Sequence, residues 1–104
     1  MTQPVTLSVP CPDRDCALSL ARAAVAGRLA ACANIYGPVT SVFTWNEAVE
    51  EEDEHVLTLK TVAARVDELA TLLQTRHPYD VPAITWETCS ADDDTLTWLA
   101  DETR

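Results

Sequence analysis

The stretch that decides the fold is Arg76-His77-Pro78-Tyr79-Asp80-Val81-Pro82, near the C-terminal third of the chain. A helical pattern of apolar residues ends there, and a β-rich run begins just after it. Pro78 cannot continue the helix, and its ring pushes His77 away from helical backbone angles. Pro82 has no amide hydrogen for a sheet ladder, so it marks a strand entry or a sheet edge. His77 and Tyr79 are therefore predicted to lie on a stiff connection between two packed elements.

Outward from this connection, the chain shows alternating strand and helix patterns without a repeat or a linker. Asp13 is expected to cap the first long helix, Thr61 the second, and Asp92 or Asp93 the last. The residues expected to face inward are Leu18, Ala21, Val25 and Leu29 in the first helix and Val62, Val66, Leu69, Ala70 and Leu73 in the second. The expected order is a strand at 5–9, a helix at 14–27, a strand from 33 to 45 interrupted at Gly37-Pro38, a polar hairpin region at 46–53, a strand at 55–60, a helix at 62–76, a strand at 83–89 and a C-terminal helix.

This order predicts an α+β fold of the ferredoxin-like βαββαβ type, with an extended hairpin of the second and third strands and an added C-terminal helix. One domain is expected over residues 1–104. Both main helices should cover one face of the sheet. The long hairpin would leave apolar surface and open strand edges that a lone chain cannot hide. Self-association is therefore expected.

Composition excludes several classes of partner. The 17 acidic residues against 7 basic ones give a formal charge of −10, which disfavours binding to nucleic acid and to anionic membranes. The charge attracts cations without forming a specific site, and it is equally consistent with solubility or adaptation to high salt. No apolar run is long enough to span a membrane. The first residues lack the pattern of a secretory signal, so a cytoplasmic location is expected.

The four cysteines, Cys11, Cys16, Cys32 and Cys89, follow neither a C-x-x-C nor a zinc spacing. Reduced thiols are favoured over a disulfide bridge. The acidic run 50–54 lacks the glycine and the alternating turn residues of a calcium loop, so a solvated hairpin face is favoured over a metal site.

His77 and Tyr79 are the leading candidates for a functional site. An imidazole at a helix end can bind a metal, hydrogen-bond a ligand or act as a base, and the alternative is an interface histidine satisfied by a backbone carbonyl. Tyr79 can present its phenol to the same space or pack at a subunit junction with its hydroxyl bonded. Trp45, Trp86 and Trp98 are expected in core or interface packing, with an aromatic ligand pocket as the alternative.

Catalysis is not expected. The chain has no G-x-S-x-G, P-loop or dinucleotide-binding motif and holds only two glycines. A Cys11–His77 pair would lack an orienting third group. An enzyme using His77 and Tyr79 in an interface cleft is kept as an alternative.

The segment His77-Pro78-Tyr79-Asp80-Val81-Pro82 resembles the HPY-x-x-P motif of the CutA family, the divalent-cation tolerance proteins. Three further matches follow the family's order, and the resemblance covers about residues 5 to 100. The first is Arg28-Leu29-Ala30-Ala31-Cys32-Ala33-Asn34, which resembles the family's LAAC-x-N step. The second is Ser41-Val42-Phe43-Thr44-Trp45, which resembles its S-x-aromatic-x-W strand. The third is Glu54 with Leu59-Lys60-Thr61, which resembles its E…LKT strand end.

The resemblance implies a compact homotrimer in which sheets meet around a threefold axis, with binding sites at the clefts between subunits. It places Trp45 at an intersubunit contact and implies that Glu54 and Lys60 fix subunit packing. The implied ligand is copper, another divalent cation or a small molecule. The alternative is a stable homotrimeric scaffold for partner proteins, or a signalling module like the PII proteins, without a metal role.

The sequence departs from the family members linked to copper. Val9 stands at their first-strand Cys, Arg76 at the first residue of their His-His pair, and Ala83 at a common Glu; Glu47-Ala48 replaces a Gly-Lys step. One imidazole without partners cannot hold copper tightly, and Arg76 repels cations. Cys11 lies two residues beyond Val9 on the same strand face, about 7 Å away, and is a candidate replacement ligand. His77 and Cys11 are therefore the predicted metal ligands.

Overall fold

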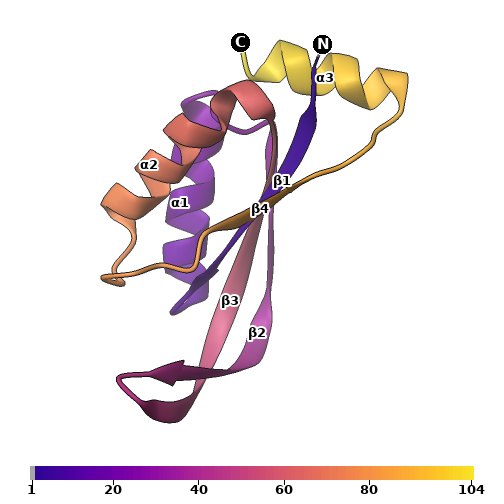
Figure 1. Ribbon diagram of the computed structural model, residues 1–104. Helices are drawn as coiled ribbons and strands as arrows, with labels where there is room; N and C mark the ends of the chain where they lie inside the picture. The colour runs from indigo at the N-terminus through magenta and orange to yellow at the C-terminus, as the bar shows by residue number, and fades with distance from the viewer. Residues whose placement is uncertain (1) are drawn as a thin grey trace.

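The structure is a computed structural model that describes residues 2–104 and forms one sheet with helices packed against it (Figure 1). The sheet order is β2-β3-β1-β4, and every neighbouring pair is antiparallel. This arrangement confirms the predicted ferredoxin-like α+β fold. The elements are β1 (Pro4–Cys11), α1 (Arg14–Ala26), β2 (Cys32–Trp45), β3 (Ala48–Val62), a 3-10 turn η1 (Ala63–Arg65), α2 (Val66–Arg76), β4 (Thr85–Thr88) and α3 (Asp93–Glu102).

The core lies between the central strands and the helices α1 and α2, which lie together on one side of the sheet (Figure 1). Leu7 pairs with Leu59, and Val9 pairs with Leu57 in the β1–β3 register. All four side chains are fully buried. Because strand side chains alternate between faces, this register sends one apolar row from each central strand toward the helices.

The buried face of α1 differs from the predicted one. Ala21 is buried as expected, but Leu18 is only half-buried and Val25 is 40% exposed. The face that packs on the sheet consists of Ala17, Leu20, Ala21 and Ala24. Apolar residues surround much of this helix, so spacing alone did not select its inner face. Three alanines allow the helix backbone to approach the sheet closely.

The β2–β3 hairpin extends beyond the rest of the domain and curls at its end (Figure 1). The polar region at 46–53 belongs to a hairpin as expected, but the third strand is longer than the predicted 55–60, because β3 begins at Ala48 and pairs with β2 along the whole acidic run. The expected interruption at Gly37-Pro38 is a register shift between Tyr36 and Val39 inside one continuous β2. The Gly37–Pro38 peptide bond is cis.

Gly37 cannot be replaced without strain. Its φ is +148°, and an added Cβ would lie 2.9 Å from the carbonyl oxygen of Glu54 and from Cδ2 of His55. Only a residue without a side chain tolerates both conditions.

The helix starts agree with the sequence in two of three places. Asp13 accepts a hydrogen bond from the Cys16 amide at 2.7 Å, and Asp92 accepts one from the Thr95 amide at 2.8 Å, as N-caps do. The predicted Thr61 cap is wrong, because η1 precedes α2 and the Thr61 hydroxyl donates to the Leu29 carbonyl instead. β4 is shorter than predicted and covers only Thr85–Thr88.

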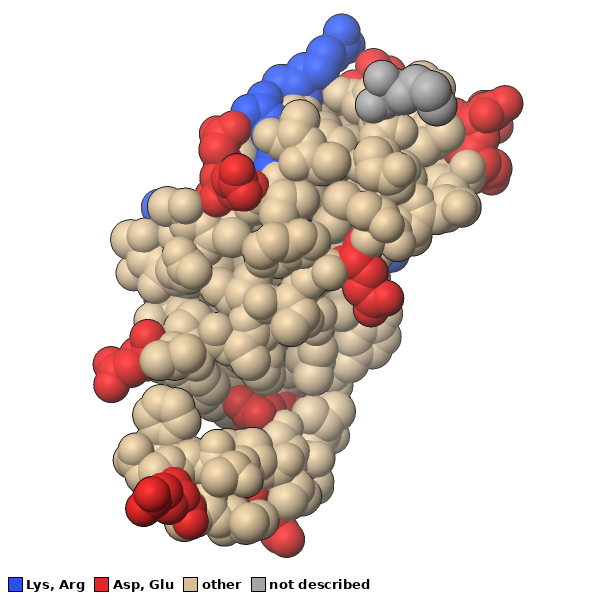
Figure 2. Space-filling view, in the orientation of Figure 1, with Lys and Arg blue, Asp and Glu red and all other residues tan. Residues whose placement is uncertain are grey.

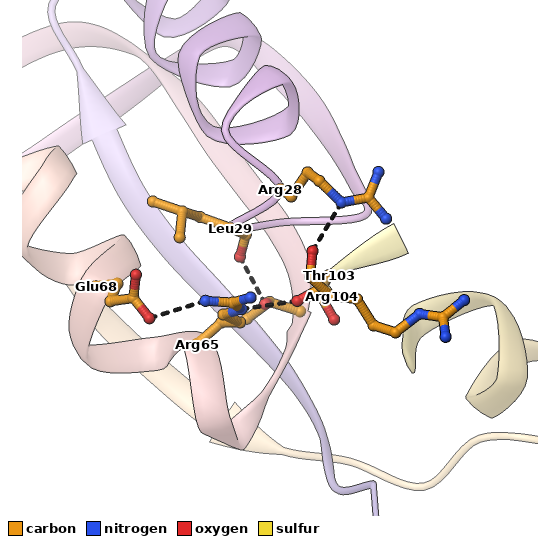
Figure 3. A network of polar contacts seen from close by, with 7 residues as sticks. Arg28, Leu29, Arg65, Glu68, Thr103 and Arg104 are labelled. Carbon is orange, nitrogen blue, oxygen red and sulfur yellow. Dashed lines mark hydrogen bonds and ion pairs between the residues drawn. The ribbon is translucent and has the colours of Figure 1, made fainter. Parts of the chain in front are cut away.

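Two arginines fasten the C-terminal segment to the domain (Figure 3). Arg28 donates to the carbonyls of Asp101 and Arg104, while Arg65 donates to the carbonyl of Thr103 at 2.7 Å and pairs with Glu68. Cations at a helix C-terminus are favourable because its carbonyls are unsatisfied. Within residues 2–104, no helix is long and apolar enough to cross a membrane.

Candidate functional site

The candidate site forms where the connection after α2 crosses the end of β1. Helix α2 ends at Arg76, and His77 takes an extended conformation with φ −72° and ψ 139° before Pro78. This is the break predicted from Pro78. His77 is 7% exposed, so the connection presents its imidazole to the protein interior rather than to solvent.

Both ring nitrogens of His77 have partners. Nδ1 accepts the amide of Tyr79 at 3.1 Å, and Nε2 lies 2.8 Å from the carbonyl oxygen of Pro10. A nitrogen that accepts an amide proton is unprotonated, so Nε2 carries the hydrogen and donates it to Pro10. These two hydrogen bonds therefore select the Nε2–H tautomer of the imidazole. Within this chain, the contacts of His77 match the alternative expected for it, a histidine whose ring is satisfied by a backbone carbonyl.

Tyr79 connects the same segment to β3. Its hydroxyl donates to Oε2 of Glu54 at 2.7 Å, and its ring lies 4.7 Å from the His77 ring, centroid to centroid. Glu54 is 5% exposed. Desolvation by burial, followed by the hydrogen bond to Glu54, raises the pKa of the Tyr79 phenol above its usual value. The phenol therefore stays protonated and serves as a donor to a buried carboxylate.

Cys11 is fully buried at the end of β1. Burial, and next the neighbouring Cys16, raises the pKa of the Cys11 thiol from 9.0 to about 12. A thiolate is the form that binds a soft metal, and burial disfavours it here. All four cysteines are free thiols in the structure, as expected.

The metal prediction for His77 and Cys11 is constrained by this geometry but remains a prediction. The two residues lie at one end of β1, since His77 bonds to the residue before Cys11. In residues 2–104, no group of three or more His, Cys, Asp or Glu side chains is placed to hold a metal ion. Binding would require His77 to give up a hydrogen bond and Cys11 to lose a proton.

The four residues predicted to lie at a subunit interface or cleft occupy two different regions of the structure. Trp45, Glu54 and Tyr79 line one cavity of about 700 Å³ between the curled hairpin and the 79–83 segment. Lys60 lies outside it, and its ammonium is 3.5 Å from the Asn34 side-chain oxygen. Glu54 and Lys60 therefore do not bond to each other within the chain, and their predicted role in subunit packing stays a prediction.

Sequence reasoning missed part of this cavity. Glu50 and Glu52 line it with Glu54; both are solvent-exposed, as predicted for a solvated hairpin face, but their place beside a cavity was not predicted. Alternate positions along a strand share a face, so Glu50, Glu52 and Glu54 point to the same side of β3. Their spacing of two residues could have indicated this, had the acidic run been recognised as a strand. His55 was also missed, and its Nδ1 is buried without a hydrogen-bond partner.

Comparison with known proteins identifies the class. A family model described as "CutA1 divalent ion tolerance protein" matches residues 5–102. A crystal structure of CutA1 from Ehrlichia chaffeensis has a TM-score of 0.94 and 30% sequence identity, and the match covers 100% of this chain and 98% of that chain. The fold is thus that of the divalent ion tolerance proteins.

The chain belongs to the CutA1 family. The divalent-cation tolerance protein CutA of Thermus thermophilus is 34% identical over 99% of both chains. The mouse protein CutA is 37% identical over 76 residues, which are 73% of this chain and 43% of the mouse protein. The chain therefore spans less than half the length of that mammalian relative.

Removal of the Tyr79 hydroxyl should destabilise the protein. Tyr79→Phe leaves one oxygen of the buried Glu54 carboxylate without its donor, which costs about 1–3 kcal/mol of unfolding free energy. Urea denaturation monitored by circular dichroism measures the loss. Tyr36→Phe is the control, because Tyr36 is 55% exposed and makes no side-chain hydrogen bond within residues 2–104. Equal stability of Tyr79→Phe and wild type would contradict a stabilising role for this bond.

Alkaline pH should destabilise the protein through Cys11. The folded-state pKa is raised above the unfolded value of 9.0, so the unfolded state releases the proton first. The Cys11 contribution is complete below pH 9 and is lost as pH rises toward about 12, with a slope of at most about 1.4 kcal/mol per pH unit. Urea denaturation under reducing conditions should show a smaller alkaline decrease in Cys11→Ala than in wild type. The exposed Cys89→Ala variant should keep the wild-type decrease, and an unchanged decrease in Cys11→Ala would refute the assignment.

Proposed function

We propose that this chain is a homotrimeric cation-tolerance protein that binds a divalent cation, copper in particular, or a small molecule at clefts between subunits. Membership of the CutA1 divalent ion tolerance family supports the general role. The observation that carries the proposal is the apolar surface of the β2–β3 hairpin. No catalytic step is part of this function, and a cytoplasmic location stays a prediction.

The hairpin has more exposed apolar surface than a small domain usually leaves in water. Its large exposed apolar side chains are Tyr36, Val42, Phe43, Trp45 and Val49. With the projecting hairpin included, the molecule is elongated, with extents of 44, 24 and 22 Å. A projecting ribbon with such side chains gains stability when further copies of the chain cover it. Closed rings of identical subunits are a common way to achieve this.

Trp45→Ala tests the assembly. The substitution removes a large aromatic side chain from the proposed contact and should shift the protein toward smaller species in sedimentation velocity at micromolar concentration. Trp98→Ala is the matched control, because Trp98 has a similar exposure of 40% but lies on α3, away from the hairpin. A wild-type protein that sediments as a monomer would end the trimer proposal, and an unchanged Trp45→Ala trimer would remove Trp45 from the interface.

His77 and Cys11 carry the proposed copper role. They come from different elements at the end of β1, since the His77 imidazole bonds to the carbonyl of Pro10, the residue before Cys11, and an imidazole and a soft thiolate are ligands that suit copper. Both groups are engaged or protonated in the metal-free arrangement, so binding should strengthen as pH rises. Arg76 is the residue before His77 and opposes a cation by charge.

Thermal denaturation with Cu²⁺ tests this role. Binding to the folded state should raise the Tm of wild type, and His77→Ala should lose the rise relative to its own metal-free Tm. Cys11→Ser tests the thiol, and Cys89→Ser controls for copper on an exposed thiol. A copper-induced rise that persists in His77→Ala would exclude His77 as a ligand. No rise with any divalent cation, together with a retained trimer, would favour the scaffold or the PII-like signalling module.

A further inference from the structure

Two thiols lie together at the junction of β1 and α1. Cys11 ends β1 and is fully buried, and Cys16 stands in the first turn of α1 and packs against the same core cluster. Burial raises the pKa of both thiols, and the contact between their side chains then raises the pKa of Cys11 and lowers that of Cys16. The Cys11 thiol is therefore the donor in this contact and the Cys16 sulfur the acceptor. Cys16 is half-buried, so the pair is not sealed from solvent.

Local structure holds the two sulfurs in place before any ligand arrives. Pro10 and Pro12 flank Cys11 and restrict the backbone on both sides of it. Asp13, the N-cap of α1, accepts the amide hydrogen of Cys16 at 2.7 Å and so fixes the turn that leads from the strand into the helix. A pair of groups held in this way needs little further ordering when it binds an ion.

His55 is an independent observation beside the thiol pair. It is the β3 partner of Cys11 in the sheet register, so both side chains lie on the sheet face that carries the core. On the other side of β3, a Cβ added to Gly37 would lie 2.9 Å from Cδ2 and 3.0 Å from Cγ of the imidazole. The Cδ2 edge of the ring thus faces β2, and Nδ1 is on the edge turned toward β1. Within residues 2–104, Nδ1 is buried and has no hydrogen-bond partner, and a thiolate at Cys11 would offer an acceptor on that side.

The number and kind of these ligands select the ion. Within the described chain, no three His, Cys, Asp or Glu side chains are placed to hold one metal ion. Zn²⁺, which takes four ligands in structural sites, and the hard cations, which take oxygen, therefore do not fit. Soft thiolates favour Cu(I), a d¹⁰ ion that is stable with two sulfur ligands in a line. Two adjacent buried thiolates would repel each other, and a cation between them removes that repulsion.

We propose that Cys11 and Cys16 bind one Cu(I) ion as a two-coordinate dithiolate, with the His55 imidazole beside it. On binding, each thiol releases its proton to solvent and two Cu–S bonds form, while copper and sulfur keep their oxidation states. This site deepens the copper role proposed above and rests on it for the choice of ion, with Cys16 in place of His77 as the second ligand. His77 keeps both of its hydrogen bonds. The thiol pair belongs to the core under the helices, so copies of the chain that cover the hairpin do not occupy it.

Competition for Cu(I) with the chromophoric chelator bathocuproine disulfonate, on fully reduced wild-type protein without oxygen, tests this site. One Cu(I) per chain should be withdrawn from the chelator, and X-ray absorption spectra of the loaded protein should show two sulfur neighbours. Cys16→Ser should weaken binding by about a hundredfold, because a single thiolate does not hold the ion alone. Cys32→Ser is the matched control, since Cys32 is also a free and half-buried thiol but lies on β2, and it should change the affinity by less than about threefold.

The variants are essential because the acidic surface of the protein (Figure 2) attracts cations without a specific site. Equal weakening in Cys16→Ser and Cys32→Ser would show scattered binding to thiols and would overturn the dithiolate. A loss of Cu(I) affinity in His77→Ala as large as that in Cys16→Ser would also overturn it. Absence of Cu(I) uptake, together with a Cu²⁺-induced rise in Tm that His77→Ala loses, would refute this site and leave the role of His77 in place. Cu(I) uptake without that rise would support this site and refute the role of His77.

A measurement on wild type covers the case in which Cys16→Ser folds poorly. One equivalent of bound Cu(I) should protect Cys16 from alkylation by iodoacetamide, as read by mass spectrometry, whereas the exposed Cys89 should react as it does in the metal-free protein. Alkylation of Cys16 at its metal-free rate in the loaded protein would refute the site.

Discussion

The structure depends on the hydrogen bonds that tie the connection after α2 to the two central strands. His77 bonds to the Pro10 carbonyl at the end of β1, and Tyr79 bonds to Glu54 on β3. β1 and β3 are adjacent in the sheet, so one short segment closes the end of both. The prolines on either side limit the alternatives available to this segment. Without these bonds Nε2 of the buried imidazole and the buried carboxylate would both lack partners, which is costly in a low-dielectric interior.

The same constraint shapes the surface that surrounds it. Glu54 accepts the hydrogen bond from Tyr79 and also lines the cavity. The boundary between the core and the cavity therefore lies at this bond. Gly37 allows β2 to pass close to the Glu54–His55 backbone at the register shift. Beyond that point the hairpin curls, and its aromatic residues lie beside the acidic row on the same face, with Phe43 paired with Glu50. The hairpin thus presents aromatic and acidic side chains on one face, and within residues 2–104 no long-range ion pair offsets these acids.

The helices illustrate where sequence patterns succeeded and where they did not. The inward face of α2 was predicted well: Val66, Leu69 and Leu73 are buried, because its apolar positions are separated by clearly polar ones. The predicted face of α1 was only partly right: Ala21 is buried, but Val25 is exposed, because alanine, leucine and valine occur around most of the helix circumference and only the approach to the sheet selects among them. Thr61 was assigned as a cap from its residue type, but the Leu29 carbonyl, distant in sequence, takes its hydroxyl. Contacts between distant segments outweighed local preference at both places.

The sequence by itself determined the order of elements, the break at His77-Pro78 and the family, because these follow from local periodicity, proline geometry and short motifs. It singled out His77, Tyr79 and Glu54 separately, without their mutual contacts. Only the tertiary structure decided that His77 faces a carbonyl, that Tyr79 reaches Glu54, and that the acidic run is a strand with alternate residues in a cavity. The physical reason is that each partner lies far along the chain, and the register of β3 with β1 and β2 places it. Register depends on how a whole sheet buries one face, which no local pattern specifies.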